Sequence, residues 1–379
     1  MLVFLFWLSL LGSVFSYLIY PVVLMLLPKR NQAGQSAPLK EGGWPKVSLI
    51  VTAHNEESRI REKIENCLKL DYPDLEILVA SDCSTDSTDS IVGEYRDVNV
   101  LLARAEDRKG KEHAQYQAIQ KSSGDILVFS DVATAIPKDA IDKLVRYFAD
   151  PAVGAVSSED RFVSRDGGVV GEGAYVRYEM WLRRLESARS GIVGLSGSFF
   201  AARRDICVTH WDIYSPSDFN TALNSAREGV VAVTAPDVLG YYQDVADASR
   251  EYHRKVRTII RGMTAVSRHP EVLNPFRFGL FAFQVMGHKL MRWAAPWFQA
   301  IFLLSSFLLA GKGGVFLLAL VAQLAFYGVV LAGYLHPQLR NHSVVKIPYF
   351  FVQVNIATIH ATLSFLLGRR MTVWTPSKR

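Results

Sequence analysis

Charged residues are missing from four long stretches of this 379-residue chain, although they make up 21% of the whole. No Asp, Glu, Lys or Arg occurs in Met1–Pro28, Trp293–Gly311, Gly313–Leu339 or Ile347–Gly368. A bilayer span needs roughly 20 mainly apolar residues, so the first three stretches predict transmembrane helices. The fourth also contains Gln353, Asn355, His360 and Ser364, which makes it the weakest candidate.

The first of these stretches also lacks the features of a cleaved signal. No basic residue precedes its apolar run, it has no clear small-x-small cleavage site, and Lys29 and Arg30 follow it. These features favour a retained membrane anchor over residues 1–28. The positive-inside tendency then places Lys29, Arg30, Lys40 and Lys46 on the cytoplasmic side.

Cysteine is scarce, and the basic residues are unevenly distributed. Cys67, Cys83 and Cys207 have no paired spacing, which argues against a disulfide framework or a cysteine metal cluster and favours reduced cytosolic thiols. The net charge of +6 does not indicate nucleic acid, because its excess lies mostly in Arg250–Arg292. Beside apolar spans, such a stretch is typical of a face toward anionic lipid.

Residues 45–270 are predicted to form one soluble α/β domain, and residues 271–379 an interfacial helix followed by a C-terminal transmembrane region. Short β-branched apolar runs alternate with segments of helical spacing in the first part of this domain. The alternation predicts a mostly parallel sheet with right-handed crossovers and flanking helices. The predicted strands are Val47–Thr52, Leu75–Ala80, Val98–Leu102, Asp125–Phe129 and Val153–Val156.

The predicted helices are less uniform in character. Glu57–Leu70, Thr85–Tyr95, Glu112–Lys121 and Lys138–Phe148 follow strands, whereas Gly171–Arg189 and Asn220–Glu228 lie in a less regular second half. Ser84 or Thr85 is the expected cap of the second helix. Ligands of such sheets bind beyond the C-terminal ends of the strands. Polar clusters fall at those ends, which predicts a binding site there.

Three residues in these clusters have both a functional and a structural interpretation. Asp82 can accept hydrogen bonds from a base or ribose, or it can cap a helix. Asp131 can coordinate a divalent cation that binds a diphosphate, or it can face water in a loop. Lys111 can neutralise phosphate, or it can belong to a solvated basic turn. The residues alone leave each pair of alternatives open.

The same holds for the second half of the domain. Asp218 can act as a general base or as a cap for the helix predicted from Asn220. Arg254 and Arg257 are three residues apart and share a helix face. Two guanidinium groups on one face suit a diphosphate, but they also suit a helix that faces the membrane.

The order of these motifs, from Val47 to about Arg261, resembles the family 2 glycosyltransferases. This large family comprises inverting, nucleotide-sugar-dependent enzymes with the GT-A fold. The segments that carry the resemblance are, in chain order, Val47–Glu57, Asp82–Asp86, Gly110–Lys111 with Ala114, Ser130–Thr134, Gly197–Arg204, Asp218 and Arg254–Arg257. The resemblance therefore implies a GT-A-like domain with N- and C-terminal transmembrane helices.

The resemblance also implies a role for each motif. The nucleoside would contact Glu56 and Asp82, and the diphosphate would contact Lys111 and Asp131, the latter with Mg²⁺ or Mn²⁺. Asp218 would be the catalytic base. The leaving nucleoside diphosphate would be stabilised by Arg254 and Arg257. The implied partners are a nucleotide sugar, at family level a UDP-sugar, and a lipid-linked or glycan acceptor at the cell membrane, with the catalytic domain cytoplasmic.

Three positions depart from the family pattern. Ala133 stands where the metal motif normally has a second Asp or Asn, and Ser217 replaces the acid that normally precedes the catalytic Asp. In the Gln-x-x-Arg-Trp motif of membrane polysaccharide synthases, Arg254 replaces Gln and Thr258 replaces Trp. These departures weigh against processive synthesis. They leave open the transfer of one sugar to a polyprenyl phosphate, and an inactive membrane scaffold.

The topology of the C-terminal region has two interpretations. Four crossings with a cytoplasmic domain would leave Gly368–Arg370 outside, against the positive-inside tendency. Either the last apolar stretch does not cross, or Phe276–Arg292 contributes another crossing. The charges of Phe276–Arg292 also fit an interfacial helix that positions the acceptor lipid.

Overall fold

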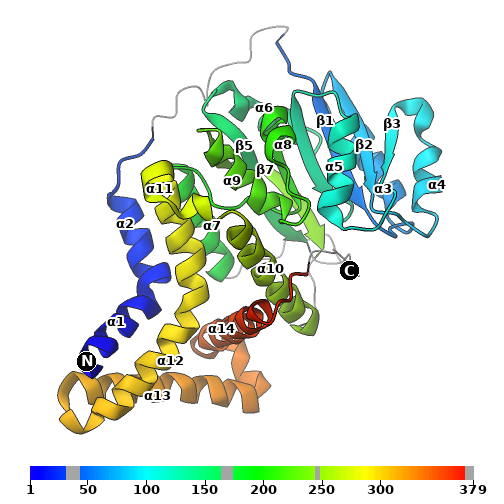
Figure 1. Cartoon of the computed structure of the whole chain (residues 1–379). Coiled ribbons are helices and arrows are strands. Elements are labelled where there is room, and N and C mark those ends of the chain that lie inside the picture. Colours follow the sequence, from blue (N-terminus) through cyan, green and yellow to red (C-terminus); the bar gives the residue numbers. More distant parts are fainter. Residues whose placement is uncertain (31–42, 164–173, 244–247, 372–379) are drawn as a thin grey trace. The chain divides into compact units, whose positions relative to one another are not determined.

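The computed structural model describes residues 1–30, 43–163, 174–243 and 248–371. The expected cytoplasmic position of Lys40 lies outside the described residues. The chain divides into two compact units. The sheet unit contains residues 27–246 and 264–284, and the helical unit contains residues 1–26, 247–263 and 285–370. The two units are shown in Figure 1.

The sheet unit is built on seven strands in the order β3-β2-β1-β4-β6-β5-β7. Neighbouring strands are parallel except for β6, which is antiparallel to both β4 and β5. The strands are β1 Val47–Ala53, β2 Leu75–Ser81, β3 Val100–Arg104, β4 Ile126–Asp131, β5 Val153–Val163, β6 Phe199–Arg203 and β7 Val231–Gln243. The predicted mostly parallel sheet with flanking helices is confirmed.

The strand register places the predicted polar clusters at one edge of the sheet. Ala53 of β1 is paired with Ser81 of β2, and Thr52 of β1 is paired with Asp131 of β4. The chain segments that leave β1 and β2, and the end of β4, therefore meet at the same edge. This edge carries Glu56, Asp82 and Asp131.

Both faces of the sheet are covered, so its central strands are mainly apolar. All seven residues of β1 are buried. Val47, Leu49 and Val51 pack into one core cluster, and Ile50 packs into the cluster on the other face. This alternation follows from the period of two in a strand. The continuous apolar run of β1 is the pattern expected for a parallel strand between two layers.

Helices flank the sheet, and several begin later than predicted. Their bounds are α3 Ile60–Leu68, α4 Thr88–Gly93, α5 Lys111–Lys121, α6 Ala140–Arg146, α7 Ala174–Ser187, α8 Arg204–His210 and α9 Ser217–Arg227. The prediction that Ser84 or Thr85 caps a helix is wrong, because α4 begins at Thr88. The carboxylate of Asp86 instead accepts a hydrogen bond from the backbone N–H of Thr88 at 3.0 Å.

Four helical runs are long and apolar enough to cross a membrane, as judged by length and composition within the described residues: Leu2–Leu26, Pro275–Lys312, Gly314–Leu335 and Ser343–Leu366. The last of these runs contains most of Ile347–Gly368, the weakest of the four stretches predicted from the sequence. Phe276–Arg292 does not form a separate candidate span, since it is the first part of the run from Pro275. That run includes α11 (Pro275–Val285), the π-helical turn Met286–Leu290 and α12 (Met291–Leu309).

The helical unit contains close contacts of the first span with α12 and with the π-helical turn that precedes it. A Cβ atom on Gly12 would lie 2.5 Å from Cγ of Phe298, and one on Gly287 would lie 2.4 Å from Cδ2 of Tyr20. Glycine is therefore required at both crossings, as is common where apolar helices pack in a bilayer. The last span, α14 (Ser343–Leu366), packs on the first part of α10 (Ala248–Arg268).

Candidate functional site

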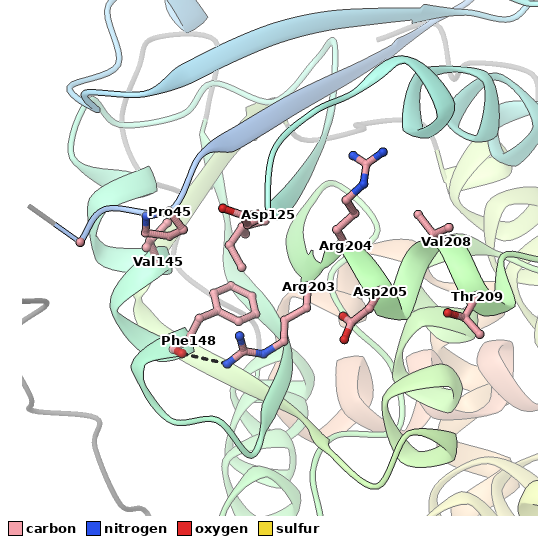
Figure 2. A pocket seen from close by; sticks show the side chains of 11 residues that line it. Pro45, Asp125, Val145, Phe148, Arg203, Arg204, Asp205, Val208 and Thr209 are labelled. Atoms are coloured by element: carbon pink, nitrogen blue, oxygen red, sulfur yellow. Dashed lines mark hydrogen bonds between the residues drawn. The ribbon is translucent and has the colours of Figure 1, made fainter.

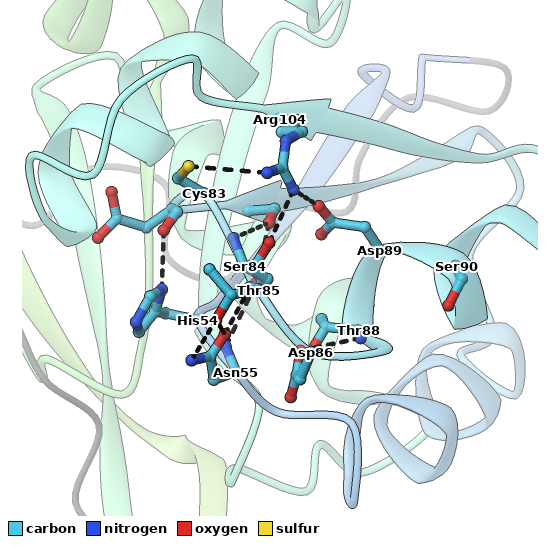
Figure 3. A network of polar contacts seen from close by, with 12 residues as sticks. His54, Asn55, Cys83, Ser84, Thr85, Asp86, Thr88, Asp89, Ser90 and Arg104 are labelled. Carbon is cyan, nitrogen blue, oxygen red and sulfur yellow. Dashed lines mark hydrogen bonds and ion pairs between the residues drawn. The ribbon is translucent and has the colours of Figure 1, made fainter.

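The loops after β1 and β2 are tied together by polar contacts, which Figure 3 shows in detail. Asn55 and Cys83 follow these strands with φ angles of 51° and 53°, a left-handed conformation that is uncommon for residues other than glycine. The side chain of Asn55 accepts a hydrogen bond from the backbone N–H of Thr85 at 2.8 Å. Such conformations persist where surrounding contacts hold them, and they occur frequently at functional sites.

Asp82 is completely buried at the centre of this region. One carboxylate oxygen accepts hydrogen bonds from the backbone N–H of Lys109 at 3.2 Å and of Gly110 at 3.1 Å. Its backbone carbonyl accepts a hydrogen bond from Nδ1 of His54 at 2.8 Å. Asp82 thus does not cap a helix in the structure. It orders the loop that leads into α5.

Glycine is required at the end of that loop. Gly110 has a φ angle of +106°, which side chains rarely tolerate. It stands immediately before Lys111, the first residue of α5. The loop held by Asp82 therefore sets the position from which the Lys111 side chain extends.

The side chain of Lys111 contacts the end of β4. Its Nζ lies 2.5 Å from Oδ1 of Asp131 and donates to the carbonyl of Gly197 at 2.8 Å. The backbone N–H of Asp131 in turn donates to the carbonyl of Ser198 at 3.0 Å. Two of the predicted diphosphate-binding residues thus form one ion pair next to the loop before β6.

A second lysine, which the sequence did not single out, lies beneath the same strand end. Lys63 of α3 is buried, and its Nζ donates to the hydroxyl of Ser130 at 2.8 Å and to the carbonyl of Thr134 at 2.5 Å. Burial lowers the pKa of this amine. Lys63 therefore links Ser130 and Thr134, which flank Asp131, and stabilises the turn between them.

Asp218 lies on the other side of the loop before β6. It is in the first turn of α9, whose cap position is occupied by Pro216. The interpretation of Asp218 as a helix cap, and the prediction that the helix begins at Asn220, are therefore wrong. A Cβ atom on Gly197 would lie 3.3 Å from Oδ2 of Asp218, so this carboxylate is adjacent to the residue that Lys111 contacts.

The remaining predicted site residues are Glu56, Arg254 and Arg257. Glu56 is buried after β1, where its backbone N–H donates to the hydroxyl of Thr88 at 2.8 Å. The two arginines lie on α10, in the part that belongs to the helical unit. Burial and the neighbouring Arg261 and Arg254 lower the pKa of Arg257. These arginines therefore lie in a locally basic stretch of the helix.

The side chains at the end of β4 fit a divalent cation of the magnesium type, with one protein carboxylate. Asp131 is partly exposed, and Ala133 adds no oxygen ligand. Among the described residues, no three His, Cys, Asp or Glu side chains form a metal-binding group. Mg²⁺ is usually held by one or two carboxylates together with water and substrate phosphates. The donor set at Asp131 therefore suits a cation that binds together with a diphosphate.

A cavity of about 690 Å³ opens elsewhere on the sheet unit (Figure 2). Asp125 lines it just before β4, whereas Asp131 ends the same strand. The guanidinium group of Arg203 donates to the carbonyls of Phe148 and Val153 at 2.9 and 2.8 Å beside this cavity. The cavity is thus at the opposite end of the strands from the predicted site and contains none of its residues.

Part of the sheet unit matches a known protein family. Residues 48–211 match the family described as Glycosyl transferase family 2. This match confirms the predicted resemblance to the family 2 glycosyltransferases over residues 48–211. The matched region contains Glu56, Asp82, Lys111 and Asp131, and it ends before Asp218.

Two curated relatives and one solved structure illustrate the similarity. Beta-monoglucosyldiacylglycerol synthase from Synechocystis is 29% identical over 185 residues, which are 46% of this chain and 39% of that protein. Hyaluronan synthase from Streptococcus pyogenes is 28% identical over 186 residues, or 46% and 44% of the two chains. The matches thus span about two fifths of the length of these relatives.

The solved structure is the mannosyltransferase PcManGT from Pyrobaculum calidifontis, in complex with GDP-Man and Mn²⁺. It superposes with a TM-score of 0.70 and 22% sequence identity, covering 97% of this chain and 99% of that one. At this level of identity the similarity shows a shared fold.

Proposed function

We propose that this protein is an inverting glycosyltransferase that moves a sugar from a nucleotide-sugar donor to a lipid-linked or growing glycan acceptor at the membrane. One observation carries the proposal. Lys111 contacts both Asp131 and the carbonyl of Gly197, and Gly197 lies against Asp218. A basic group for a diphosphate and a carboxylate for an acceptor hydroxyl therefore flank one short loop.

On the donor side, we assign Glu56 and Asp82 to the nucleoside and Lys111 and Asp131 to the diphosphate. The carboxylate of Asp82 already accepts bonds from the loop before Lys111, and each carboxylate oxygen can accept more than one hydrogen bond. Asp131 would hold Mg²⁺ or Mn²⁺, and this cation would neutralise charge on the diphosphate. The Mn²⁺ bound to the mannosyltransferase of the same fold supports this assignment.

On the acceptor side, Asp218 takes the proton from the acceptor hydroxyl as that oxygen attacks the anomeric carbon. The bond from the anomeric carbon to the diphosphate breaks in the same displacement, so the product has the inverted configuration. Charge then grows on the leaving nucleoside diphosphate. We assign Arg254 and Arg257 to this charge, because donors that act on developing charge stabilise the transition state.

The acceptor is proposed to be a lipid rather than a long polymer. The first relative is a synthase of a glucosylated diacylglycerol by its name, and the departures at Arg254 and Thr258 weigh against processive synthesis. The four candidate spans support a multi-pass membrane protein. The proposal includes a cytoplasmic sheet unit, where nucleotide sugars, among them UDP-sugars, are available.

The test is a screen of the purified full chain in lipid nanodiscs against UDP- and GDP-sugars, with and without Mg²⁺ or Mn²⁺. Released nucleoside diphosphate and the mass and anomeric configuration of the lipid product are measured. We expect one donor to give a product extended by a single sugar of inverted configuration. No release from any donor in acceptor-containing membranes, or a retained configuration, would overturn the proposal.

A further inference from the structure

The loop Ser196–Ser198, which precedes β6, contacts the three charged residues assigned to the reaction. The carbonyl of Gly197 accepts from Nζ of Lys111 at 2.8 Å. The carbonyl of Ser198 accepts from the backbone N–H of Asp131 at 3.0 Å. On the other side, Gly197 lies against the carboxylate of Asp218. The position of this loop therefore sets the spacing between the donor-side and acceptor-side groups.

A carboxylate that belongs to none of the recognised motifs holds this loop. Asp160 of β5 accepts from the hydroxyl of Ser196 at 2.6 Å to Oδ1 and 2.8 Å to Oδ2. Its Oδ1 also accepts from the hydroxyl of Ser198 at 2.6 Å. These two serines flank Gly197, so one carboxylate clamps both ends of the loop. Burial raises the pKa of the Asp160 carboxyl, and the hydrogen bonds from Ser196 and Ser198 oppose that shift.

The pairing of β5 with β7 is irregular next to Asp160. Ser158 pairs with Ala235 and Glu159 with Leu239, so the extra residues at this register shift lie in β7. Irregularities of this kind are frequent next to active sites. Before the shift, the hydroxyl of Ser157 accepts from the backbone N–H of Ser196 at 2.7 Å. After it, Asp160 reaches the side chains of the same loop.

We propose that Asp160 is a positioning residue for glycosyl transfer, which acts through Ser196 and Ser198 to hold Lys111, Asp131 and Asp218 in their reactive spacing. The proposal rests on the transferase function proposed above. A purely packing role would not require contacts with two serine hydroxyls on either side of the residue that Lys111 and Asp218 share. Misplacement of reacting groups by about 1 Å can cost about 10²-fold in rate.

The neighbouring residue provides a matched control. Glu159 is also buried on β5, but its carboxylate accepts from Arg184 at 2.8 Å and does not contact the loop in any described interaction. Glu159→Gln removes a buried carboxylate one residue away. It is expected to change thermal stability while leaving the spacing around Gly197 intact.

The experiment compares Asp160→Asn, Asp160→Ala and Glu159→Gln in the full chain in nanodiscs. Transfer kinetics, UDP affinity and backbone hydrogen exchange of residues 195–199 are measured. Asn can keep one serine contact and Ala keeps none, so we expect kcat to fall about tenfold in Asp160→Asn and about a hundredfold in Asp160→Ala. UDP affinity should change by less than about threefold, as expected when an interaction acts mainly in the transition state.

A double-mutant cycle separates positioning from general stability. If Asp160 acts through the serines, Asp160→Asn in a Ser196→Ala, Ser198→Ala background should lower kcat much less than it does in the wild type. Equal losses in the two backgrounds, or an equal loss of kcat in Glu159→Gln, would overturn the proposal. The exchange measurement requires no turnover. An inactive wild type would therefore count against the transferase function, whereas unchanged exchange in Asp160→Ala would count against the clamp.

Discussion

The amine of Lys111 and the carboxylate of Asp131 form an ion pair 2.5 Å long between the start of α5 and the end of β4. The Lys111 side chain is largely shielded from solvent, and that of Asp131 is about a quarter exposed. The two groups assigned to the diphosphate are thus paired with each other. The exposed part of Asp131 remains accessible to a ligand.

The first prediction concerns Asp131, which is the only carboxylate in its motif. Asp131→Asn should lower transfer by at least about a hundredfold, the scale of losing a key charge-stabilising group. Transfer rates across a series of Mg²⁺ and Mn²⁺ concentrations test this. Asp125→Asn, at the other end of the same strand, is the control and should behave as wild type. Full activity of Asp131→Asn with unchanged metal dependence would rule out the assignment.

The second prediction concerns Asp218. Asp218→Asn should fold and bind the donor normally but transfer at least about a hundredfold more slowly, in line with the contribution of a positioned base. Because Pro216 occupies the cap position of α9, Asp218→Ala should also retain its melting temperature. Glu228→Gln, just beyond the other end of this helix, is the control. Near-normal transfer by Asp218→Asn would refute its role as the base.

The third prediction concerns the basic helix α10. Arg254→Ala and Arg257→Ala should lower turnover more than donor binding, since the charge of the leaving group develops in the transition state. Initial rates and nucleotide affinity are the measurements. Arg268→Ala, near the end of the same helix, is the control for general loss of positive charge, and rates are compared below its melting temperature because it also loses the ion pair with Asp212. If the variants only detach the protein from membranes, the arginines serve the lipid surface instead.

The fourth prediction concerns pH and stability. Although burial alone raises it, hydrogen bonds from His269 and Arg268 hold the pKa of Asp212 well below its ordinary value. A depressed pKa adds stability above the unfolded pKa of about 3.9, and this contribution is lost as the pH falls through that region. Asp212→Asn should therefore melt at a lower temperature than wild type at pH 7.

The difference in melting temperature between Asp212→Asn and wild type should shrink as the pH is lowered from about 5 toward 3. Thermal unfolding in detergent at several pH values measures it. Asp205→Asn, another acid of the sheet unit, is the control and should show no such convergence. A constant difference across the range would show that Asp212 contributes through packing alone.

Of the first four strands, β1, β2 and β4 could be predicted because they are apolar runs buried for most of their length, and β3, at the edge of the sheet, because it is a short β-branched and apolar run. Their parallel pairing also follows from the alternation with helices, whereas their order was not predicted. The later strands could not be predicted in the same way. β5 continues past Val156 through a register shift, β6 is a short antiparallel insertion, and the prediction contained no strand at β7. Their pairing depends on tertiary contacts that local periodicity does not encode.

In the candidate site, too, some residues could be found from the sequence and others only from the folded structure. Glu56, Asp82, Lys111 and Asp131 stand at strand ends or helix starts, where sequence order marks them. The sequence does not mark Lys63 or Asp160. A lysine in an amphipathic helix is an ordinary surface pattern, and so is an acid that follows a short predicted strand, here Val153–Val156. Only the folded chain brings Lys63 to Ser130 and Asp160 to Ser196. The roles assigned to all of the predicted site residues, including Asp218 and the two arginines, rest on resemblance and stay predictions.

The packing of Gly12 against Phe298 also affects how the protein is made. At about 5–20 residues per second, roughly 15 to 60 seconds of translation separate these two residues. During this interval the candidate span Leu2–Leu26 lacks the partner that covers its glycine. The ribosome meanwhile delivers the whole sheet unit. Assembly of the helical unit is therefore a late event, and a chain interrupted before α12 would leave Gly12 uncovered.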